Sequence, residues 1–159
     1  MRSSSLCLAA AVIACQIAWL AASPAPPCDP GWRHLERAQA CFRFIPGSYG
    51  FGTATRRCQE HYANAATIGS SEENELVREL AHGTDAWIGA ISYEPFLEYS
   101  WVDGTPFGYF ERWQGGYRPD IEGTHPCVKI DGYGEWFTSC CRKMAAIVCK
   151  KQASYMHSK

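Results

Sequence analysis

The chain has 159 residues, of which 47% are hydrophobic and 19% are charged, and its formal net charge is −1. This length suffices for one ordinary domain with a short leader, and the lack of a basic excess excludes a protein that binds nucleic acid mainly through charge. The chain also contains 9 cysteines. Whether these are bridged or free depends on the compartment.

The first predicted element is a leader over residues 1–22. One positive charge, Arg2, precedes an apolar run over 6–22, which ends in small residues and the stretch SPAPP. This order is typical of a secretory signal peptide, and the lack of a basic cluster after the run favours cleavage within 21–23 over a membrane anchor. Because Arg2 is the only charged residue that leaves, the net charge changes from −1 to −2. Residues 23–27 then form a short linker at the start of a secreted, extracellular protein.

The next part of the chain alternates between strand and helix patterns. Apolar and polar residues alternate over 40–46, which predicts a strand. Apolar residues that recur every three or four positions predict one helix over 53–63 and a second over 71–81. Ser70 and Glu73 have the S-x-x-E spacing of a capping box, which marks the start of the second helix.

The later part of the chain has no helical period. A short apolar run predicts a buried strand over 86–91, and closing strands are predicted over 127–130, 135–137 and 145–149. Between them, residues 93–126 are rich in Gly, Pro and aromatic residues, and so long an irregular segment is usually functional. Two early helices, strands at both ends and a long late loop indicate an α+β domain.

The long segment is expected to have a small core of its own. Its members would be Trp101, Tyr109, Phe110, Trp113 and Tyr117. After the last strand, the segment 151–159 lacks a periodic apolar pattern and is expected to be a flexible tail.

Loss of the leader removes Cys7 and Cys15 and leaves an odd number of cysteines. Those that remain are Cys28, Cys41, Cys58, Cys127, Cys140, Cys141 and Cys149. In an oxidising compartment they are expected to pair, and no CxxC or HxxxH spacing points to a zinc site. Spacing alone leaves the connectivity open. It favours a short bridge between Cys28 and Cys41 and a long one from Cys58 to near the C-terminus.

Three stretches together resemble the C-type lectin-like domain. They are WIGA at 87–90, WVDGTPFGYFERW at 101–113 and CQEHYANAATIGSSEENELV at 58–77. Their order and spacing match the core strand, the tryptophan–Asp–Gly turn and the two helices of that family. The resemblance implies a disulfide-stapled α+β domain over 28–150, with two helices, two small antiparallel sheets and a long irregular loop.

The resemblance also implies three disulfides. The last of them rests on Trp136, which lies five residues before Cys141, as the family spaces this pair. The implied bridges are Cys28–Cys41, Cys58–Cys149 and Cys127–Cys141. Cys140 is then the odd cysteine, which would link two chains, be capped by a small thiol, stay free, or replace Cys141 in its bridge.

Lectins of this family bind sugar through a calcium ion, and this chain departs from their ligand pattern. The Glu-Pro-Asn or Gln-Pro-Asp motif of the long loop reads Arg118-Pro119-Asp120 here, and no acid directly precedes Cys127. Phe137 and Thr138 stand where the family has Asn and Asp. Asp120 is therefore the clearest oxygen ligand that remains, with Glu122 as a possible helper.

The charge of Arg118 also opposes a bound cation. At ~4 Å and an effective dielectric constant of ~20, each unit-charge repulsion costs ~4 kcal/mol, and a divalent ion doubles it. Calcium prefers 6–8 oxygen ligands, which two carboxylates do not supply. We therefore expect no calcium at the usual sugar site and no other cofactor.

Two functions follow from these residues. The first is a calcium-independent recognition module that binds a glycan, with an acidic glycan favoured by Arg118, at a surface formed by Tyr117, Arg118, Asp120, Glu122 and His125. A salt bridge from Arg118 to Asp120 or Glu122 is an equally good interpretation of that arginine. The second is a protein-binding or disulfide-linked oligomeric module, tethered as a homodimer through Cys140.

Catalysis is not expected, because the chain has neither a GxSxG nor an HExxH motif. The tryptophans Trp87, Trp101 and Trp136 are expected to belong to the core and not to a sugar platform.

Overall fold

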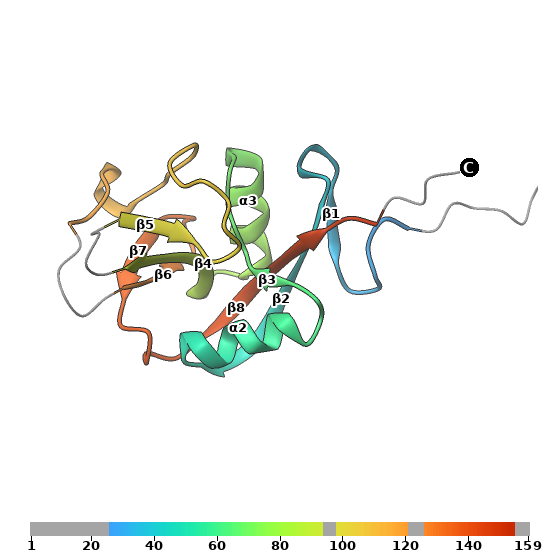
Figure 1. Cartoon of the computed structure of the whole chain (residues 1–159), viewed down its shortest axis with the longest axis horizontal. Coiled ribbons are helices and arrows are strands. Elements are labelled where there is room, and N and C mark those ends of the chain that lie inside the picture. Colours follow the sequence, from blue (N-terminus) through green and yellow to red (C-terminus); the bar gives the residue numbers. More distant parts are fainter. Residues whose placement is uncertain (1–25, 94–97, 121–125, 155–159) are drawn as a thin grey trace, which may run out of the picture. The chain divides into compact units, whose positions relative to one another are not determined.

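The computed structural model describes residues 26–93, 98–120 and 126–154, and contacts group Cys28–Ser154 into one unit (Figure 1). Within it, α2 lies along β8, and the long loop that follows β5 lies at the end of the unit away from β1. In chain order the elements are β1 (Arg33–Leu35), η1 (Glu36–Ala38), β2 (Ala40–Tyr49), α2 (Phe51–Gln59), β3 (Asn64–Ala65), α3 (Ser71–Leu80), β4 (Ala86–Tyr93), β5 (Glu98–Trp101), η2 (Gln114–Gly116), β6 (Cys127–Ile130), β7 (Trp136–Ser139) and β8 (Ala145–Gln152). None of the described helices is long and apolar enough to cross a bilayer.

The first predicted helix exists but is shifted toward the N-terminus. It begins at Phe51, whose backbone N–H donates to the carbonyl oxygen of Cys141 at 2.8 Å. Ala54 and Cys58 are fully buried, as their spacing predicts, but Tyr62 is 93% exposed. The prediction for Tyr62 is wrong because the residue has a positive φ of 55° and lies in the turn after the helix.

The second predicted helix matches α3 closely, and its capping box is confirmed. The Ser70 hydroxyl accepts a hydrogen bond from the Glu73 backbone N–H at 3.2 Å, and the Glu73 carboxylate accepts one from the Gly69 N–H at 2.6 Å. The buried Glu73 side chain also pairs with Lys150 at 2.5 Å. The cap therefore links the start of α3 to β8.

The strands form one mixed sheet, and this corrects the prediction of two separate antiparallel sheets. The strand order is β1-β2-β8-β4-β6-β7, with β3 added to β8 and β5 added to β4. The pairing is antiparallel except between β4 and β8, where Ala86 lies opposite Ala146 and Trp87 lies opposite Ile147 in parallel. That short contact joins two antiparallel halves. A predicted strand pattern does not reveal such a non-local pairing.

The segment WIGA is the crossing point of the sheet. A Cβ atom at Gly89 would lie 2.6 Å from the carbonyl oxygen of Ala65, so only glycine fits there. Trp87, Trp101 and Trp136 are buried, as expected. β5 lies within the segment that was predicted to be irregular.

The last strand extends beyond the predicted end of the domain. β8 includes Lys151 and Gln152, and the backbone N–H of Ala153 donates to the carbonyl of Gln39 at 2.9 Å. The prediction of a tail from residue 151 is therefore wrong for these positions, because pairing with β2 continues through them.

The disulfides are Cys28–Cys41, Cys58–Cys149 and Cys127–Cys141, which are the pairs that the family resemblance implies. The sheet register places the neighbouring cysteines close to Cys127, just after the end of β7. Ser139 lies opposite Cys127, and side chains two residues apart point to the same face of a strand. Cys141 follows the end of β7 and bonds to Cys127, whereas Cys140 is a free, half-buried thiol.

Candidate functional site

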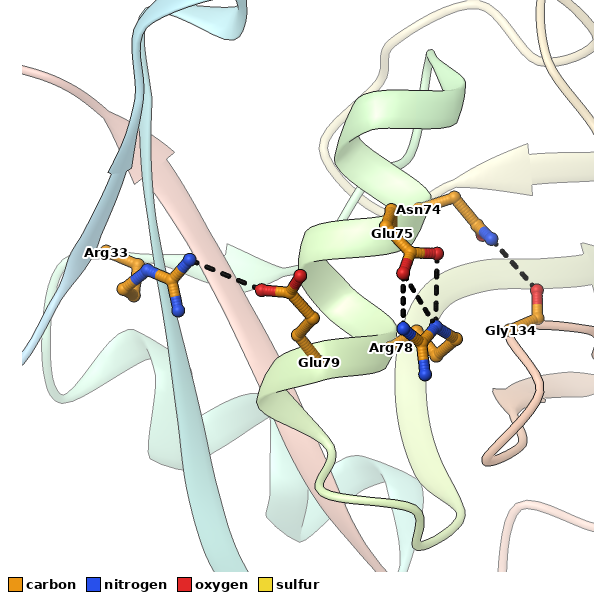
Figure 2. A network of polar contacts seen from close by, with 6 residues as sticks. All are labelled: Arg33, Asn74, Glu75, Arg78, Glu79 and Gly134. Carbon is orange, nitrogen blue, oxygen red and sulfur yellow. Dashed lines mark hydrogen bonds and ion pairs between the residues drawn. The ribbon is translucent and has the colours of Figure 1, made fainter.

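The long loop is anchored to the sheet through Trp136. The backbone N–H of Trp136 donates to the carbonyl of Arg112 at 2.7 Å, and Trp113 forms an isolated parallel bridge with Trp136. The Trp136 indole N–H donates to the Asn74 side-chain oxygen at 2.7 Å. The Asn74 amide in turn donates to the Gly134 carbonyl at 2.9 Å, the contact drawn in Figure 2. Helix α3, β7 and the loop therefore meet at one buried polar group.

Aromatic rings fill the space beneath the loop. Phe107 packs on Trp101 with ring centroids 5.1 Å apart, and Trp113 packs on Tyr99 at 4.8 Å. Trp136 makes an edge contact with Trp101 at 5.6 Å. Aromatic pairs of this kind contribute ~0.5–1.5 kcal/mol each beyond their buried area.

The predicted loop core is therefore partly correct. Trp101 and Trp113 are buried and Phe110 is partly buried, but Tyr109 and Tyr117 are 80% and 77% exposed. Phe107, which was not named in that core, is the ring that packs between Trp101 and Tyr99.

Among the described residues, Arg118 is bound by Glu111 and not by Asp120, one of the two acids that the sequence suggested. Its Nε donates to Glu111 Oε2 at 2.8 Å, and its Nη2 donates to Glu111 Oε1. The guanidinium also lies over the Phe107 ring, 5.3 Å from its centroid. Arg118 and Glu111 thus form a bidentate pair, and the Phe107 ring packs against the guanidinium. Together these contacts fix the direction of the Arg118 side chain.

Glu111 is the centre of this arrangement. Besides Arg118, its carboxylate accepts a hydrogen bond from the Trp113 indole N–H at 2.6 Å. The hydrogen bond from Arg118 lowers the pKa of Glu111 most strongly, and partial burial opposes this effect. The carboxylate therefore stays ionised at neutral pH and neutralises the arginine.

The other predicted site residues differ in their placement. Tyr117, which precedes Arg118 in the chain, is an exposed ring, and Asp120 is exposed and forms no ion pair with the described residues. Pro119 is linked to β5 by a hydrogen bond, in which the Tyr99 hydroxyl donates to the Pro119 carbonyl at 3.3 Å. Glu122 and His125 lie outside the described residues.

Two clefts meet at Arg118. The first has a volume of about 470 Å³ and is lined by β5, the segment 104–107 and Arg118. The second has a volume of about 510 Å³ and is lined by Glu111, Arg112, Trp113, Gly116, Arg118 and Glu135. The arginine thus forms part of the wall of both.

Comparison with known proteins identifies the family. The family model of the lectin C-type domain matches residues 48–151, from the end of β2 to the end of β8. The chain belongs to the C-type lectin domain family.

This C-type lectin domain is similar to proteins of several kinds. It is 29% identical over 128 residues to the low affinity immunoglobulin epsilon Fc receptor of Mus musculus, covering 80% of this chain but 38% of the receptor. It is 30% identical over 131 residues to the type-2 ice-structuring protein of Osmerus mordax, covering 80% of this chain and 73% of that protein. The crystal structure of a calcium-independent type II antifreeze protein aligns with a TM-score of 0.73 and 25% identity, covering 84% of this chain and 100% of the other.

The residues of this lectin domain do not fit a calcium ion at the loop motif. Of Arg118, Pro119 and Asp120, only Asp120 offers a side-chain oxygen, and the guanidinium of Arg118 supplies a positive charge at the same place. The carboxylate of Glu111 is already held by Arg118. In the part of the chain that the structure describes, no group of three His, Cys, Asp or Glu side chains is arranged to hold a metal.

Sequence reasoning missed Glu111 as the partner of Arg118. It lies seven positions before Arg118 in an irregular segment, where no periodicity relates two side chains. The available signal was its position two residues before the buried Trp113, within the stretch that resembles the family's loop.

Proposed function

We propose that this protein is a secreted recognition module that binds a carbohydrate or another extracellular ligand through its long loop, without the calcium ion used by many lectins. The observation that carries the proposal is the Arg118–Glu111 pair at the position of the calcium motif. In this proposal the guanidinium of Arg118 supplies a positive charge where lectins of the family hold a metal ion. Glu111 balances that charge within the loop. The similarity to an antifreeze protein described as calcium-independent supports this proposal.

The surface beside the pair suits a ligand with both apolar and hydroxyl groups. Tyr109 and Tyr117 of the same loop present exposed rings, and the two clefts that share Arg118 are lined by both aromatic and polar side chains. Sites that combine aromatic rings with a few convergent polar groups are typical of small-ligand recognition.

The pairing also changes the expected charge of the ligand. Glu111 binds Nε and Nη2 of the guanidinium and balances its charge, and Nη1 has no acceptor among the described residues. An acidic glycan would gain little attraction from such a neutral pair. We therefore favour a neutral ligand over the acidic one that Arg118 alone suggested.

A glycan array tests this proposal when it is probed once with millimolar calcium and once with chelator. We expect the same glycans to be bound under both conditions. Arg118→Ala should weaken that binding roughly tenfold, whereas Arg57→Ala, which removes an exposed arginine of α2 paired with Glu60, should leave it unchanged. Binding that disappears with chelator would contradict the proposal.

A second candidate function is assembly through Cys140. The backbone N–H of Arg142 hydrogen-bonds to the thiol and lowers the pKa of Cys140, which favours the reactive thiolate. A disulfide-linked homodimer predicts a mass on non-reducing electrophoresis that halves with reductant and is lost in Cys140→Ser. A single monomer band under both conditions excludes this candidate.

A further inference from the structure

The second cleft, of about 510 Å³, contains one positive and one negative side chain that are not paired with each other or with another residue. Its charged lining residues are Glu111, Arg112, Arg118 and Glu135. Glu111 and Arg118 bind each other. Arg112 and Glu135 form no ion pair and no side-chain hydrogen bond with the described residues. The described part of the chain therefore leaves one cation and one anion of this cleft for a ligand.

The backbone places Arg112 and Glu135 side by side. The Trp136 N–H donates to the Arg112 carbonyl at 2.7 Å, and Trp113 and Trp136 form a parallel bridge. Both tryptophans are buried, with exposed fractions of 4% and 0%. Successive side chains of an extended chain point to opposite faces. Arg112 and Glu135 each come one position before a buried tryptophan, so both side chains face away from the core, toward the cleft that they line.

Hydrogen bonds to Asp131 fix the backbone around these two residues. The Glu135 N–H donates to Asp131 Oδ1 at 2.9 Å, and the Asp131 N–H donates to the Glu135 carbonyl at 2.9 Å. The Gln114 side chain donates to Asp131 Oδ2 at 2.8 Å. Asp131 thus ties the segment after Arg112 to the turn before Glu135. A ligand that bridges the two charged groups does not have to order this backbone, which lowers the cost of binding.

The acid of α3 closest in sequence to this network does not neutralise Arg112. Glu75 and Arg112 both line the neighbouring groove between β1 and α3. The Glu75 carboxylate is held by Arg78, whose Nε donates to both of its oxygens at 3.0 Å (Figure 2). The guanidinium of Arg112 therefore keeps its hydrogen-bond donors available.

The balance of charge in the second cleft indicates the class of ligand. Two arginines and two glutamates line it, so the cleft favours neither a polyanion nor a polycation. A guanidinium binds a carboxylate through two parallel hydrogen bonds, and a carboxylate accepts hydrogen bonds from an ammonium group, which has three donors. A ligand that satisfies both unpaired side chains thus carries a carboxylate and an ammonium group close together.

We propose that the second cleft binds the head group of an α-amino acid. Its carboxylate lies on Arg112 and its ammonium group lies on Glu135. The two ligand groups are attached to one carbon atom, which suits two side chains that start from adjacent backbone positions. Neither residue belongs to the calcium motif at 118–120, and the first cleft stays free. The site therefore stands whether or not the long loop binds a glycan.

The ligand class is tested by a titration of the full protein that follows its backbone amide signals by NMR. The probes are glycine and L-phenylalanine, and the matched analogues are N-acetyl-L-phenylalanine, which lacks the cation, and L-phenylalaninamide, which lacks the carboxylate. We expect the amino acids to shift the amide signals of Gly116 and Glu135, and each analogue to bind roughly tenfold more weakly or less. Equal binding of an analogue, or no shift with either amino acid, overturns the proposal.

The two side chains are tested by substitution. Arg112→Gln and Glu135→Gln each remove one unpaired charge without breaking an ion pair, and each should weaken amino-acid binding roughly tenfold. Glu98→Gln is the matched control, because Glu98 is an exposed glutamate that lines the first cleft and not the second. It should leave amino-acid binding unchanged. Unchanged binding in Arg112→Gln or in Glu135→Gln overturns the proposal.

Methyl α-mannoside, added in the same titration, separates this site from recognition of a sugar by the loop. Shifts at Ser100 and Thr105 of the first cleft, without any response to the amino acids, overturn the amino-acid site and leave the proposed recognition function standing. Shifts at Gly116 and Glu135 with the sugar but not with the amino acids overturn the ligand class.

Discussion

The part of the unit around β2 and β8 and the part around the long loop are held together by different forces. In the first, the Cys58–Cys149 disulfide crosses a fully buried core, and Glu73 pairs with Lys150 beneath the start of α3. In the second, aromatic rings and the Arg118–Glu111 pair hold an otherwise irregular chain. The difference teaches that a covalent bridge crosses the first core, whereas the loop depends on packed rings and one ion pair.

Removing the Cys58–Cys149 disulfide should have the largest effect on the stability of the first part. The double variant Cys58→Ala, Cys149→Ala opens a loop with a sequence separation of 91 and should lower the free energy of unfolding by about 4–5 kcal/mol in the chain-entropy model. Urea unfolding followed by circular dichroism measures this loss. Cys140→Ser, which removes a free thiol, is the control and should have little effect. Equal losses in the two variants would contradict the covalent-scaffold account.

Trp136→Phe tests whether the two parts share an anchor. The change removes the indole donor and leaves the buried side-chain oxygen of Asn74 without that partner. We expect a loss of about 2–3 kcal/mol in the free energy of unfolding, from the unsatisfied acceptor and the lost ring volume. Trp113→Phe provides the comparison, because the acceptor of its indole, Glu111, is partly exposed and can bind water. A smaller loss for Trp136→Phe than for Trp113→Phe would show that Trp136 is not the main anchor.

The sequence predicted the local features of this molecule better than the distant ones. The capping box of α3 was found because Ser70 and Glu73 are three residues apart and act on the same helical turn. The parallel contact between β4 and β8 was not found, because it joins segments about sixty residues apart and has no pattern of its own. Tyr62 fitted a helical stripe, but the chain leaves the helix before reaching it.

In the candidate site, too, the sequence predicted the local feature but not the distant contact. Arg118 was identified because it replaces a residue of a known motif, and the sequence then offered only its neighbours Asp120 and Glu122 as partners. The actual partner, Glu111, comes close because Phe107 and Trp113 pack inward and bring the two ends of the loop segment together. Such a contact depends on packing, which spacing in an irregular segment does not encode.

The smallest expected effect is the pH dependence of the loop. Because Arg118 lowers the pKa of Glu111 in the folded state, the pair contributes stability that is fully present above the unfolded value and is lost as pH falls through the lowered one. The Arg118 side chain is 47% exposed, so the contribution should be below about 1 kcal/mol.

Tyrosine and tryptophan fluorescence of the loop, recorded from neutral pH to about pH 3, measures this effect. In the protein without substitutions, a small change in fluorescence should appear at a pH below the range in which glutamate ordinarily titrates. In Glu111→Gln this change should be absent. Glu60→Gln, whose pair with Arg57 lies on α2, should keep the transition. A transition that survives in Glu111→Gln would mean that another carboxylate controls the loop. The claim that the Arg118–Glu111 pair stabilises the loop would then lose its main support.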